Sequence, residues 1–235
     1  MNIALLGYGK MGKMIEQISL KRGHHIVARI DLETVKINYG EIDVAIDFSV
    51  PESAVDNIRG CLANGVPVIS GTTGWLNRYE EVADYCKEKK GAFLYSSNFS
   101  LGVNIFFELN NILAGLIANS KNYKVSIDET HHIHKLDAPS GTAITLAEGI
   151  IEATDYSKWE LDGKGEDTVV VHSHREGEVP GTHIVTYSGS VDEISIKHKA
   201  YNREGFALGA VVAAEWIQGK QGVFSMKDVL NLGTK

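Results

Sequence analysis

The segment from Glu129 to Ala143, "ETHHIHKLDAPSGTA", carries three of the chain's nine histidines next to a lysine. An imidazole with an ordinary pKa of about 6.5 can donate or accept a proton near neutral pH. Lys135 adds a fixed positive charge four residues after His131. Residues of these types, placed this close together, are suited to holding an anion and protonating it.

The residues that follow predict the start of a helix. Pro139 suits the first helical position, with Asp137 or Ala138 at the cap, because the N–H that proline lacks has no partner there. Ser140–Thr142 would then present backbone N–H groups and hydroxyls at the positive end of the helix "SGTAITLAEGII". Such an end binds carboxylate or phosphate, so the segment is predicted to hold an acidic small molecule.

Two other interpretations of the histidines stay open. The strand "KVSIDETHH" alternates, so His131 and His132 should face opposite sides, while His132 and His134 should share one. A zinc site needs three or four convergent ligands, and neither a cysteine nor a suitably spaced second cluster completes one, so no metal is predicted. The histidines could also be exposed residues at a strand end.

A glycine motif near the N-terminus predicts a second kind of site. Gly7, Gly9 and Gly12 stand in G-x-G-x-x-G register between a strand and a helix. These glycines allow the tight turn, the approach of a pyrophosphate and close helix–strand packing. Asp31, nineteen residues past Gly12, could accept the ribose hydroxyls of a dinucleotide. The alternative is a turn that merely packs, with Asp31 a surface charge.

Small polar residues end three later strands. In open α/β sheets, ligands bind beyond the carboxyl ends of the strands, where small residues let a dinucleotide approach. Any single one of these strand ends could be an ordinary turn, but together they favour a cofactor cleft. The three groups are Asp47, Phe48 and Ser49; Gly71, Thr72, Thr73 and Gly74; and Ser96, Ser97, Asn98 and Phe99.

The order of the segments predicts an α/β fold with two domains. Up to residue 100, short apolar strands alternate with helix-like segments, which indicates a parallel sheet flanked by helices. Beyond it, "DTVVVHSHREG", "THIVTYSG" and "VDEISIKHKA" are alternating strands typical of a mixed or antiparallel sheet. We therefore predict a Rossmann-like dinucleotide-binding domain, residues 1–100 and 203–235, interrupted by an α+β domain of mixed sheet, residues 101–202.

Composition excludes several classes of protein. With 43% hydrophobic and 23% charged residues, the chain can bury a core, and a net charge of −7 argues against nucleic acid as a partner. No apolar run reaches the roughly 18 residues that span a bilayer, so no membrane partner is predicted. Cys61 and Cys86 are too few for a disulfide framework, which predicts reduced thiols and a cytoplasmic location.

Taken together, these segments resemble the family of bacterial 4-hydroxy-tetrahydrodipicolinate (dihydrodipicolinate) reductases, of the diaminopimelate route to lysine. The resemblance covers nearly the whole chain through "GYGKMG", "IDFSVPES", "GTTGW", "SSNFSLGVN", "ETHHIHKLDAPSGTA", "REGEVPGTH" and "GVFSMKDVLNL". The pairing of "HHIHK" with "DAPSGTA" is far more specific than the glycine motif. The family reduces a cyclic dicarboxylic imine, adding hydride at ring C4 with loss of the 4-hydroxyl as water.

The resemblance implies roles for particular residues. His131 would be the general acid/base, and Lys135 a proton donor and charge stabiliser. The inserted domain would bind the dicarboxylate substrate and assemble a homotetramer, with domain closure over the ligands. The substrate-binding residues would be His132, Lys135, Ser140, Gly141 and Thr142, and those for NADH or NADPH Gly7, Tyr8, Gly9, Lys10, Met11, Gly12, Asp31, Phe48, Gly71, Thr72, Thr73, Ser96, Ser97, Asn98 and Phe99.

Two positions depart from the family pattern. Members often carry arginine directly after the acid of the second strand and after the serine of "DFS", where this chain has Leu32 and Val50. An acid without a neighbouring arginine favours the ribose diol of NADH over the 2′-phosphate of NADPH. Arg29 and Lys36 are near in sequence, so the expected cofactor is NADH or NADPH with a preference for NADH.

Two other functions compete with the reductase. A non-catalytic dinucleotide sensor would use the glycine motif but leave His131 and Lys135 without a task. A metal-dependent hydrolase would use the histidines but leave the glycine motif idle. Substrate-dependent oxidation of NADH would exclude the sensor, and activity that survives a chelator would exclude the hydrolase.

Overall fold

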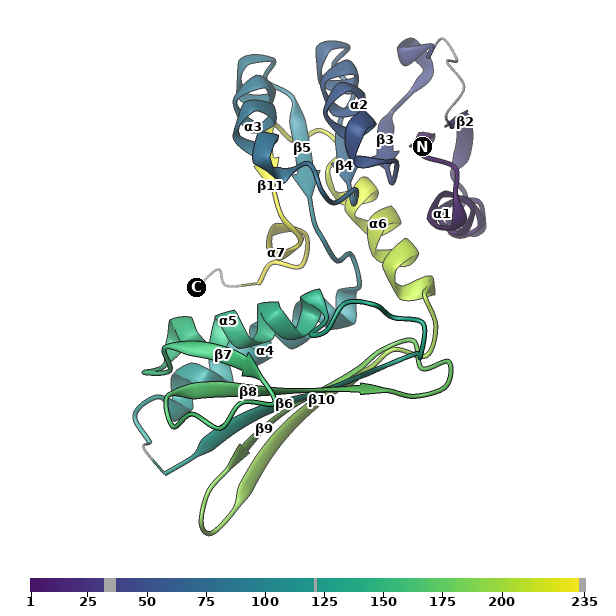
Figure 1. Ribbon diagram of the computed structural model, residues 1–235. Coiled ribbons are helices and arrows are strands. Elements are labelled where there is room, and N and C mark those ends of the chain that lie inside the picture. The colour runs from purple at the N-terminus through teal and green to yellow at the C-terminus, as the bar shows by residue number, and fades with distance from the viewer. Residues whose placement is uncertain (32–36, 121, 233–235) are drawn as a thin grey trace. The chain divides into compact units, whose positions relative to one another are not determined.

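The computed structural model describes residues 1–31, 37–120 and 122–232. The chain divides into two compact units, unit 1 of Met1–Leu101 with Glu204–Lys235 and unit 2 of Gly102–Arg203 (Figure 1). The sequence placed the boundaries after residues 100 and 202, and the division of the structure follows residues 101 and 203. Each unit has a sheet and a core of its own.

Unit 1 is built on a six-stranded parallel sheet in the order β11-β5-β4-β3-β1-β2. Within its described residues, four helices and two 3₁₀ turns connect the strands, and a short helix follows the last strand. The strands are β1 (Asn2–Leu6), β2 (His25–Ile30), β3 (Val44–Asp47), β4 (Val68–Ser70), β5 (Ala92–Tyr95) and β11 (Gly222–Phe224). The helices are α1 (Lys10–Lys21), η1 (Tyr39–Glu41), α2 (Pro51–Ala63), η2 (Leu76–Arg78), α3 (Tyr79–Glu88), α6 (Glu204–Trp216) and α7 (Met226–Val229).

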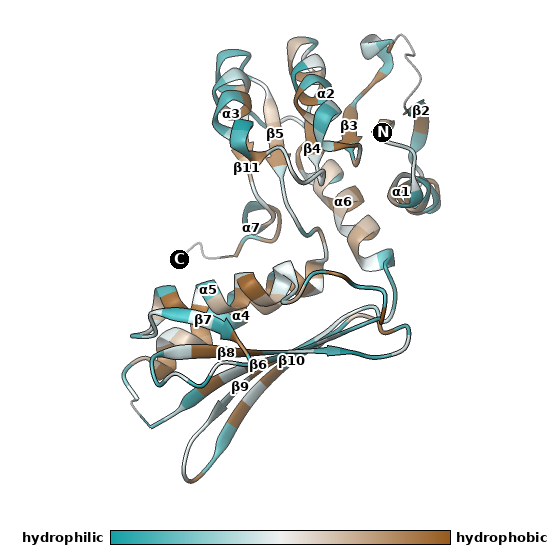
Figure 2. Ribbon diagram, in the orientation of Figure 1, coloured by the Kyte–Doolittle hydropathy of each residue, from teal (hydrophilic) through white to brown (hydrophobic). Residues whose placement is uncertain are grey.

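Helices cover both faces of this sheet. Successive side chains of a strand point to opposite faces, so Ile3 and Leu5 pack with α1 and α6, whereas Ala4 and Leu6 pack with α2 and α3. Figure 2 colours β3 as hydrophobic and much of α3 as hydrophilic. Burial on both sides explains why the central strands are continuous apolar runs.

Unit 2 has a five-stranded mixed sheet in the order β10-β9-β6-β8-β7. Its central strand, β6, pairs parallel with β8 and antiparallel with β9. The apolar sides of two helices form the core with this sheet, and both helices lie on the same side of it (Figure 1). The elements are α4 (Leu101–Ile117), β6 (Lys124–His131), α5 (Gly141–Ala153), β7 (Lys158–Leu161), β8 (Thr168–Arg175), β9 (Thr182–Ser188) and β10 (Glu193–Lys199).

The predicted fold class is confirmed, since a parallel sheet of Rossmann type and a mixed sheet are both present. The predicted position of Pro139 is wrong. Helix α5 begins at Gly141, because the hydroxyl of Ser140 accepts the N–H of Ala143 at 3.2 Å and so forms the N-cap. Within the described ranges, no helix is long and apolar enough to cross a membrane.

Candidate functional site

The glycine loop of unit 1 joins β1 to α1, and its glycines differ in what surrounds them. A Cβ on Gly7 would collide with the carbonyl of Phe48, and one on Gly12 with the carbonyl of Gly7. Gly7 also has a φ of +94°, which side-chain-bearing residues rarely adopt. A Cβ on Gly9 would meet nothing within 4 Å, so the loop is open to a ligand at that residue.

A cavity of about 320 Å³ lies beside this loop, at the carboxyl ends of β2 and β3. Asp31 is exposed and lines it, as the sequence predicts for the ribose carboxylate. Leu32 and Lys36, which bear on the choice of dinucleotide, lie outside the described residues. The cavity is lined by Gly7, Tyr8, Gly9, Ile30, Asp31, Phe48, Ser49, Val50, Ser53 and Asn57.

Arg29 is already engaged on the neighbouring strand. Its guanidinium forms an ion pair with Glu16 and lies over the ring of Tyr8, 5.8 Å from the ring centroid. The Tyr8 hydroxyl donates to the same carboxylate. A 2′-phosphate would therefore have to compete with Glu16 for this arginine.

A buried carboxylate orders the ends of β3 and β4. Asp47 is fully buried and accepts hydrogen bonds from the hydroxyls of Ser49, Ser70 and Thr72 at 2.6, 2.7 and 2.8 Å. Burial raises the pKa of Asp47, although these donors oppose the shift. The side chain of Thr72, a predicted cofactor residue, is thus committed to the protein.

The other predicted cofactor residues fall into two groups. Phe99 and Gly71 have packing roles: Phe99 is buried against Phe48, with ring centroids 5.6 Å apart, and Gly71 leaves space for the ring of Phe48, which a Cβ there would strike. Ser96 donates its hydroxyl to the carbonyl of Asn98 at 2.7 Å. The remaining side chains are exposed or half-buried; they are Lys10, Met11, Thr73, Ser97 and Asn98, whose Oδ1 accepts the N–H of Ser100 at 2.9 Å.

In unit 2, strand pairing brings four polar side chains to one face of the sheet. Glu129 and His131 are two residues apart on β6 and so share a face. In the sheet register, Glu129 pairs with His183 on β9, and His131 pairs with Arg175 at the end of β8. Directly paired residues project to the same side, so all four converge.

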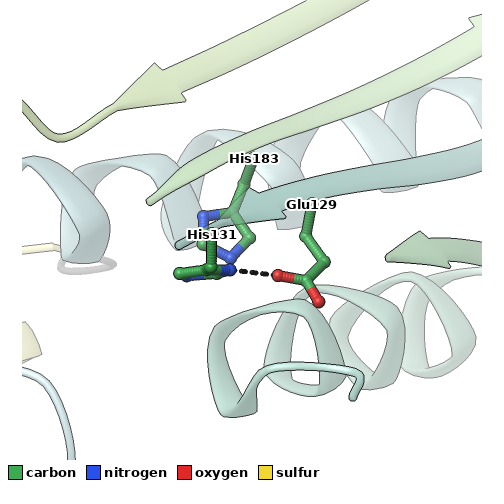
Figure 3. A group of neighbouring side chains, drawn as sticks. All are labelled: Glu129, His131 and His183. Carbon is green, nitrogen blue, oxygen red and sulfur yellow. Dashed lines mark hydrogen bonds and ion pairs between the residues drawn. The ribbon is translucent and has the colours of Figure 1, made fainter. Parts of the chain in front are cut away.

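Glu129 is the centre of this cluster (Figure 3). One oxygen of its carboxylate is hydrogen-bonded to Nδ1 of His131, and the other accepts both Nη groups of Arg175, each at 3.0 Å. The rings of His131 and His183 meet edge to face, 5.1 Å apart. Nε2 of His183 lies 3.0 Å from the hydroxyl of Ser140, the cap of α5.

Burial and charge shift the pKa values of the cluster. Burial by itself would raise the pKa of Glu129, but hydrogen bonds from His131 and Arg175 outweigh it and lower the pKa to about 2. Burial, and secondarily the neighbouring His131, lowers the pKa of His183 to about 3. At neutral pH the cluster therefore holds a carboxylate and a neutral His183.

The predicted substrate residues surround the start of α5. Lys135 donates to both carboxylate oxygens of Asp137 at 2.8 Å, and this contact lowers the pKa of Asp137. Gly141 is exposed, and a Cβ there would meet nothing within 4 Å. The first N–H groups of a helix have no acceptor within it, so Gly141 and Thr142 offer donors to an anion. The Ser140 hydroxyl, by contrast, is committed to Ala143 and His183.

His132 and His134 follow the end of β6 and contact each other. Their rings are 6.2 Å apart, whereas His131 is buried at the end of β6. Nδ1 of His132 is buried and has no hydrogen-bond partner among the described residues. A polar group left in this state is available to a ligand.

Sequence reasoning missed Glu129, Arg175 and His183 as parts of the site. The period-two spacing of Glu129 and His131 was a usable sign, because it places both on one face of a strand. The segment "REGEVPGTH" contains Arg175 and His183, but only the register of β6 with β8 and β9 brings them to His131.

The same cluster also has the residue types of a metal site. Ligand atoms of Glu129, His131 and His183 lie within 4.8 Å of one another. However, Arg175 and His131 already engage both oxygens of the carboxylate. A cation there would have to compete with these donors, so the arrangement favours proton chemistry.

Comparison with known proteins places the chain in a family. The N-terminal model of dihydrodipicolinate reductase matches residues 1–99, and the C-terminal model matches residues 102–230. The chain is 56% identical to the 4-hydroxy-tetrahydrodipicolinate reductase of Christiangramia forsetii, over 98% of each chain. It is 40% identical to the enzyme of the same name from Methanoculleus marisnigri, over 83% of this chain and 79% of that one.

A solved structure shows the same fold. The dipicolinate-bound dihydrodipicolinate reductase of Paenisporosarcina sp. TG-14 has a TM-score of 0.79 at 22% identity, covering 95% of this chain and 97% of that chain. Matches to both family models and to relatives along nearly the whole sequence give one assignment. The chain belongs to the dihydrodipicolinate reductase family.

Proposed function

We propose that the protein is a 4-hydroxy-tetrahydrodipicolinate reductase of lysine and diaminopimelate biosynthesis. It reduces (2S,4S)-4-hydroxy-2,3,4,5-tetrahydrodipicolinate to 2,3,4,5-tetrahydrodipicolinate with NAD(P)H. One hydride and one proton enter the substrate, and one water leaves. The observation that carries this proposal is the 56% identity to a reductase of that name along 98% of the chain.

The residues of unit 1 fit a nicotinamide dinucleotide. Backbone is exposed at Gly9 where a pyrophosphate would need to approach, Asp31 lines the adjacent cavity, and the α1 N-terminus follows directly. When bound, the dinucleotide would supply the hydride. We favour NADH, because Arg29 is paired with Glu16 and Val50 occupies a position where relatives often have arginine.

The residues of unit 2 suit the acidic substrate and the proton. His131 is the general acid/base, and Nε2 is the atom it can offer, because Nδ1 is bonded to Glu129. Lys135 is the proton donor and charge stabiliser, and the N–H groups of Gly141 and Thr142 receive a carboxylate. In the structure Lys135 pairs with Asp137, a carboxylate that the substrate would have to replace.

A spectrophotometric assay tests the function. Enzymatically generated substrate is added to the protein with NADH or NADPH, and the loss of absorbance of the reduced nicotinamide is followed. We expect substrate-dependent oxidation, with a higher kcat/KM for NADH than for NADPH. Absence of oxidation with either cofactor would refute the proposal, and activity that a chelator removed and zinc restored would favour the hydrolase.

Assembly and location are further parts of the proposal. A homotetramer formed through the sheet of unit 2 is expected from the family resemblance, and light scattering on the purified protein measures it. The cytoplasm is the expected compartment, since Cys61 and Cys86 are buried free thiols and form no disulfide.

A further inference from the structure

The carboxylate of Glu129 is fully buried, and both of its oxygens take part in hydrogen bonds. Its relative exposure is 0%, and one oxygen faces Arg175 while the other faces Nδ1 of His131. A buried charge costs several kcal/mol unless it is paired and hydrogen-bonded. Arg175 supplies the compensating charge, so Glu129 can remain ionised beside the imidazole.

An ionised Glu129 determines which nitrogen of His131 carries the proton. A carboxylate can only accept hydrogen bonds, so Nδ1 must be the N–H donor. Nε2 is then the nitrogen that exchanges a proton with a ligand. A Cβ on residue 181 would lie 3.0 Å from Nε2, so the glycine there leaves that nitrogen uncovered.

Arg175 extends the same contact to the loop that carries Lys135. Its Nη2 group donates to the carbonyl of Asp137 at 2.7 Å, and the side chain of Asp137 holds the Lys135 ammonium. The loop is also tied to the residues that follow β8 by the N–H of Ile133, which donates to the carbonyl of Gly177 at 3.1 Å. The acid and the lysine are thus anchored to one buried ion pair.

We propose that Glu129, held by Arg175, is a positioning residue of the reductase: it fixes the Nδ1–H tautomer of His131 and aims Nε2 at the substrate. This inference rests on the proposed function, in which His131 is the general acid/base. A carboxylate that accepts the second ring N–H of a metal-bound histidine orients that ring in the same way, and its loss costs about 10- to 100-fold. Glu129 itself touches no substrate.

A double-mutant cycle separates positioning from a purely structural role. Glu129→Gln keeps the size of the side chain and removes the charge; we expect kcat to fall about 10- to 100-fold with KM changed less than about threefold. His131→Asn is expected to lose more. In the double variant, Glu129→Gln should cost less than about threefold beyond His131→Asn alone, because it acts through that imidazole.

The chain offers a matched control one residue away. Asp128 on β6 and His174 on β8 form a carboxylate–histidine pair on the exposed face of the sheet. Oδ1 of Asp128 and Nε2 of His174 are 3.0 Å apart. Asp128→Asn should leave kcat within about twofold, since exposed pairs contribute little. NADH affinity of every variant, measured by fluorescence titration, reports whether unit 1 is intact.

Nitrogen NMR reports the tautomer of His131 in the wild-type protein, and a variant is needed only to assign the signal. Labelled His131, assigned by its loss in His131→Asn, should show the Nδ1–H form at neutral pH. An Nε2–H form would overturn the positioning role. So would a double variant in which the fall in kcat equals the product of the falls in the two single variants. Failure of the proposed function looks different, because the wild-type protein would then oxidise neither NADH nor NADPH when substrate is added.

Discussion

The candidate sites of the two units differ in what forms them: backbone and open space in unit 1, and charged side chains in unit 2. The site in unit 1 relies on backbone: glycines that remove side chains, and hydroxyls ordered by one buried carboxylate, Asp47. The site in unit 2 relies on charge: Glu129 is buried, Arg175 is half-buried, and both lie beside His131. A cofactor bound through its backbone phosphates needs space and N–H donors, whereas proton transfer needs groups whose ionisation is controlled.

The difference has a consequence for acid stability. In unit 2 the folded state lowers the pKa of Glu129 and of His183, so stability falls as pH falls. In unit 1 burial raises the pKa of Asp47, so its contribution is present below its unfolded pKa and is lost as pH rises through the folded one. Acid should therefore weaken unit 2 before unit 1.

The largest expected effect separates the tasks of the two sites. His131→Ala should lower kcat by about 10² or more, because a general acid is lost, while the Kd for NADH changes less than about twofold. Steady-state kinetics and fluorescence titration measure the two quantities. If cofactor affinity collapsed together with turnover, the division of labour between the two segments would be wrong.

The second prediction uses the contrast between two glycines of the loop. Gly9→Ala places a Cβ in open space, so the melting temperature should stay within about 2 °C while NADH affinity falls, because a ligand must approach there. Gly12→Ala forces a Cβ against the carbonyl of Gly7 and should lower both. We expect at least about tenfold weaker binding in each case. Equal NADH affinity in wild type and Gly9→Ala would remove Gly9 from the cofactor site.

The glycine pattern and strand alternation made unit 1 the easier half to predict from sequence. The motif Gly7 to Gly12 and the strand before it lie within the first twelve residues, so they specify a local turn. The apolar runs predict the parallel sheet. Phe99 and Thr72 could not be recognised as packing residues, because their partners Phe48 and Asp47 lie on another strand.

In unit 2 the sequence predicted roles for His131 and Lys135 but did not point to Glu129 and Arg175, which lie against His131. His131 and Lys135 stand in one short segment, whereas Arg175 is forty-four residues from His131 and reaches it only through parallel pairing. Pro139 was misplaced for a local reason, since the hydroxyl of Ser140 is a better helix cap than the residues before it. The register between strands that are distant in the sequence cannot be deduced from a single sequence.

The third prediction tests the difference in acid stability. The folded pKa of His183 is about 3 against an ordinary value of 6.5, so the unfolded chain binds more protons between these values and stability falls as pH falls through this window. From pH 6.5 to 4.5, this residue alone should cost about 2 kcal/mol. Urea unfolding of His183→Gln should show a correspondingly flatter pH dependence.

A control on the same sheet sharpens this result. His172 forms an exposed pair with Asp162 at 2.8 Å, so His172→Gln should leave the pH dependence of the unfolding free energy close to that of wild type. Hydrogen exchange adds a regional readout: amides of β6 and β9 should lose protection at a higher pH than those of β3 and β4. The reverse order would contradict the contrast between the two units.

The smallest effect concerns Lys135, the proposed charge partner of the substrate. Lys135→Ala should raise KM and also lower kcat, because an ammonium that pairs with a carboxylate acts in both the ground state and the transition state. Asp137→Asn releases Lys135 from its present partner, so it should lower KM a few-fold, about 1 kcal/mol or less for a partly exposed pair. A higher KM in Lys135→Ala and a lower KM in Asp137→Asn would show that Asp137 and the substrate compete for the Lys135 ammonium. An unchanged KM in Lys135→Ala would exclude Lys135 as a contact of the substrate carboxylate.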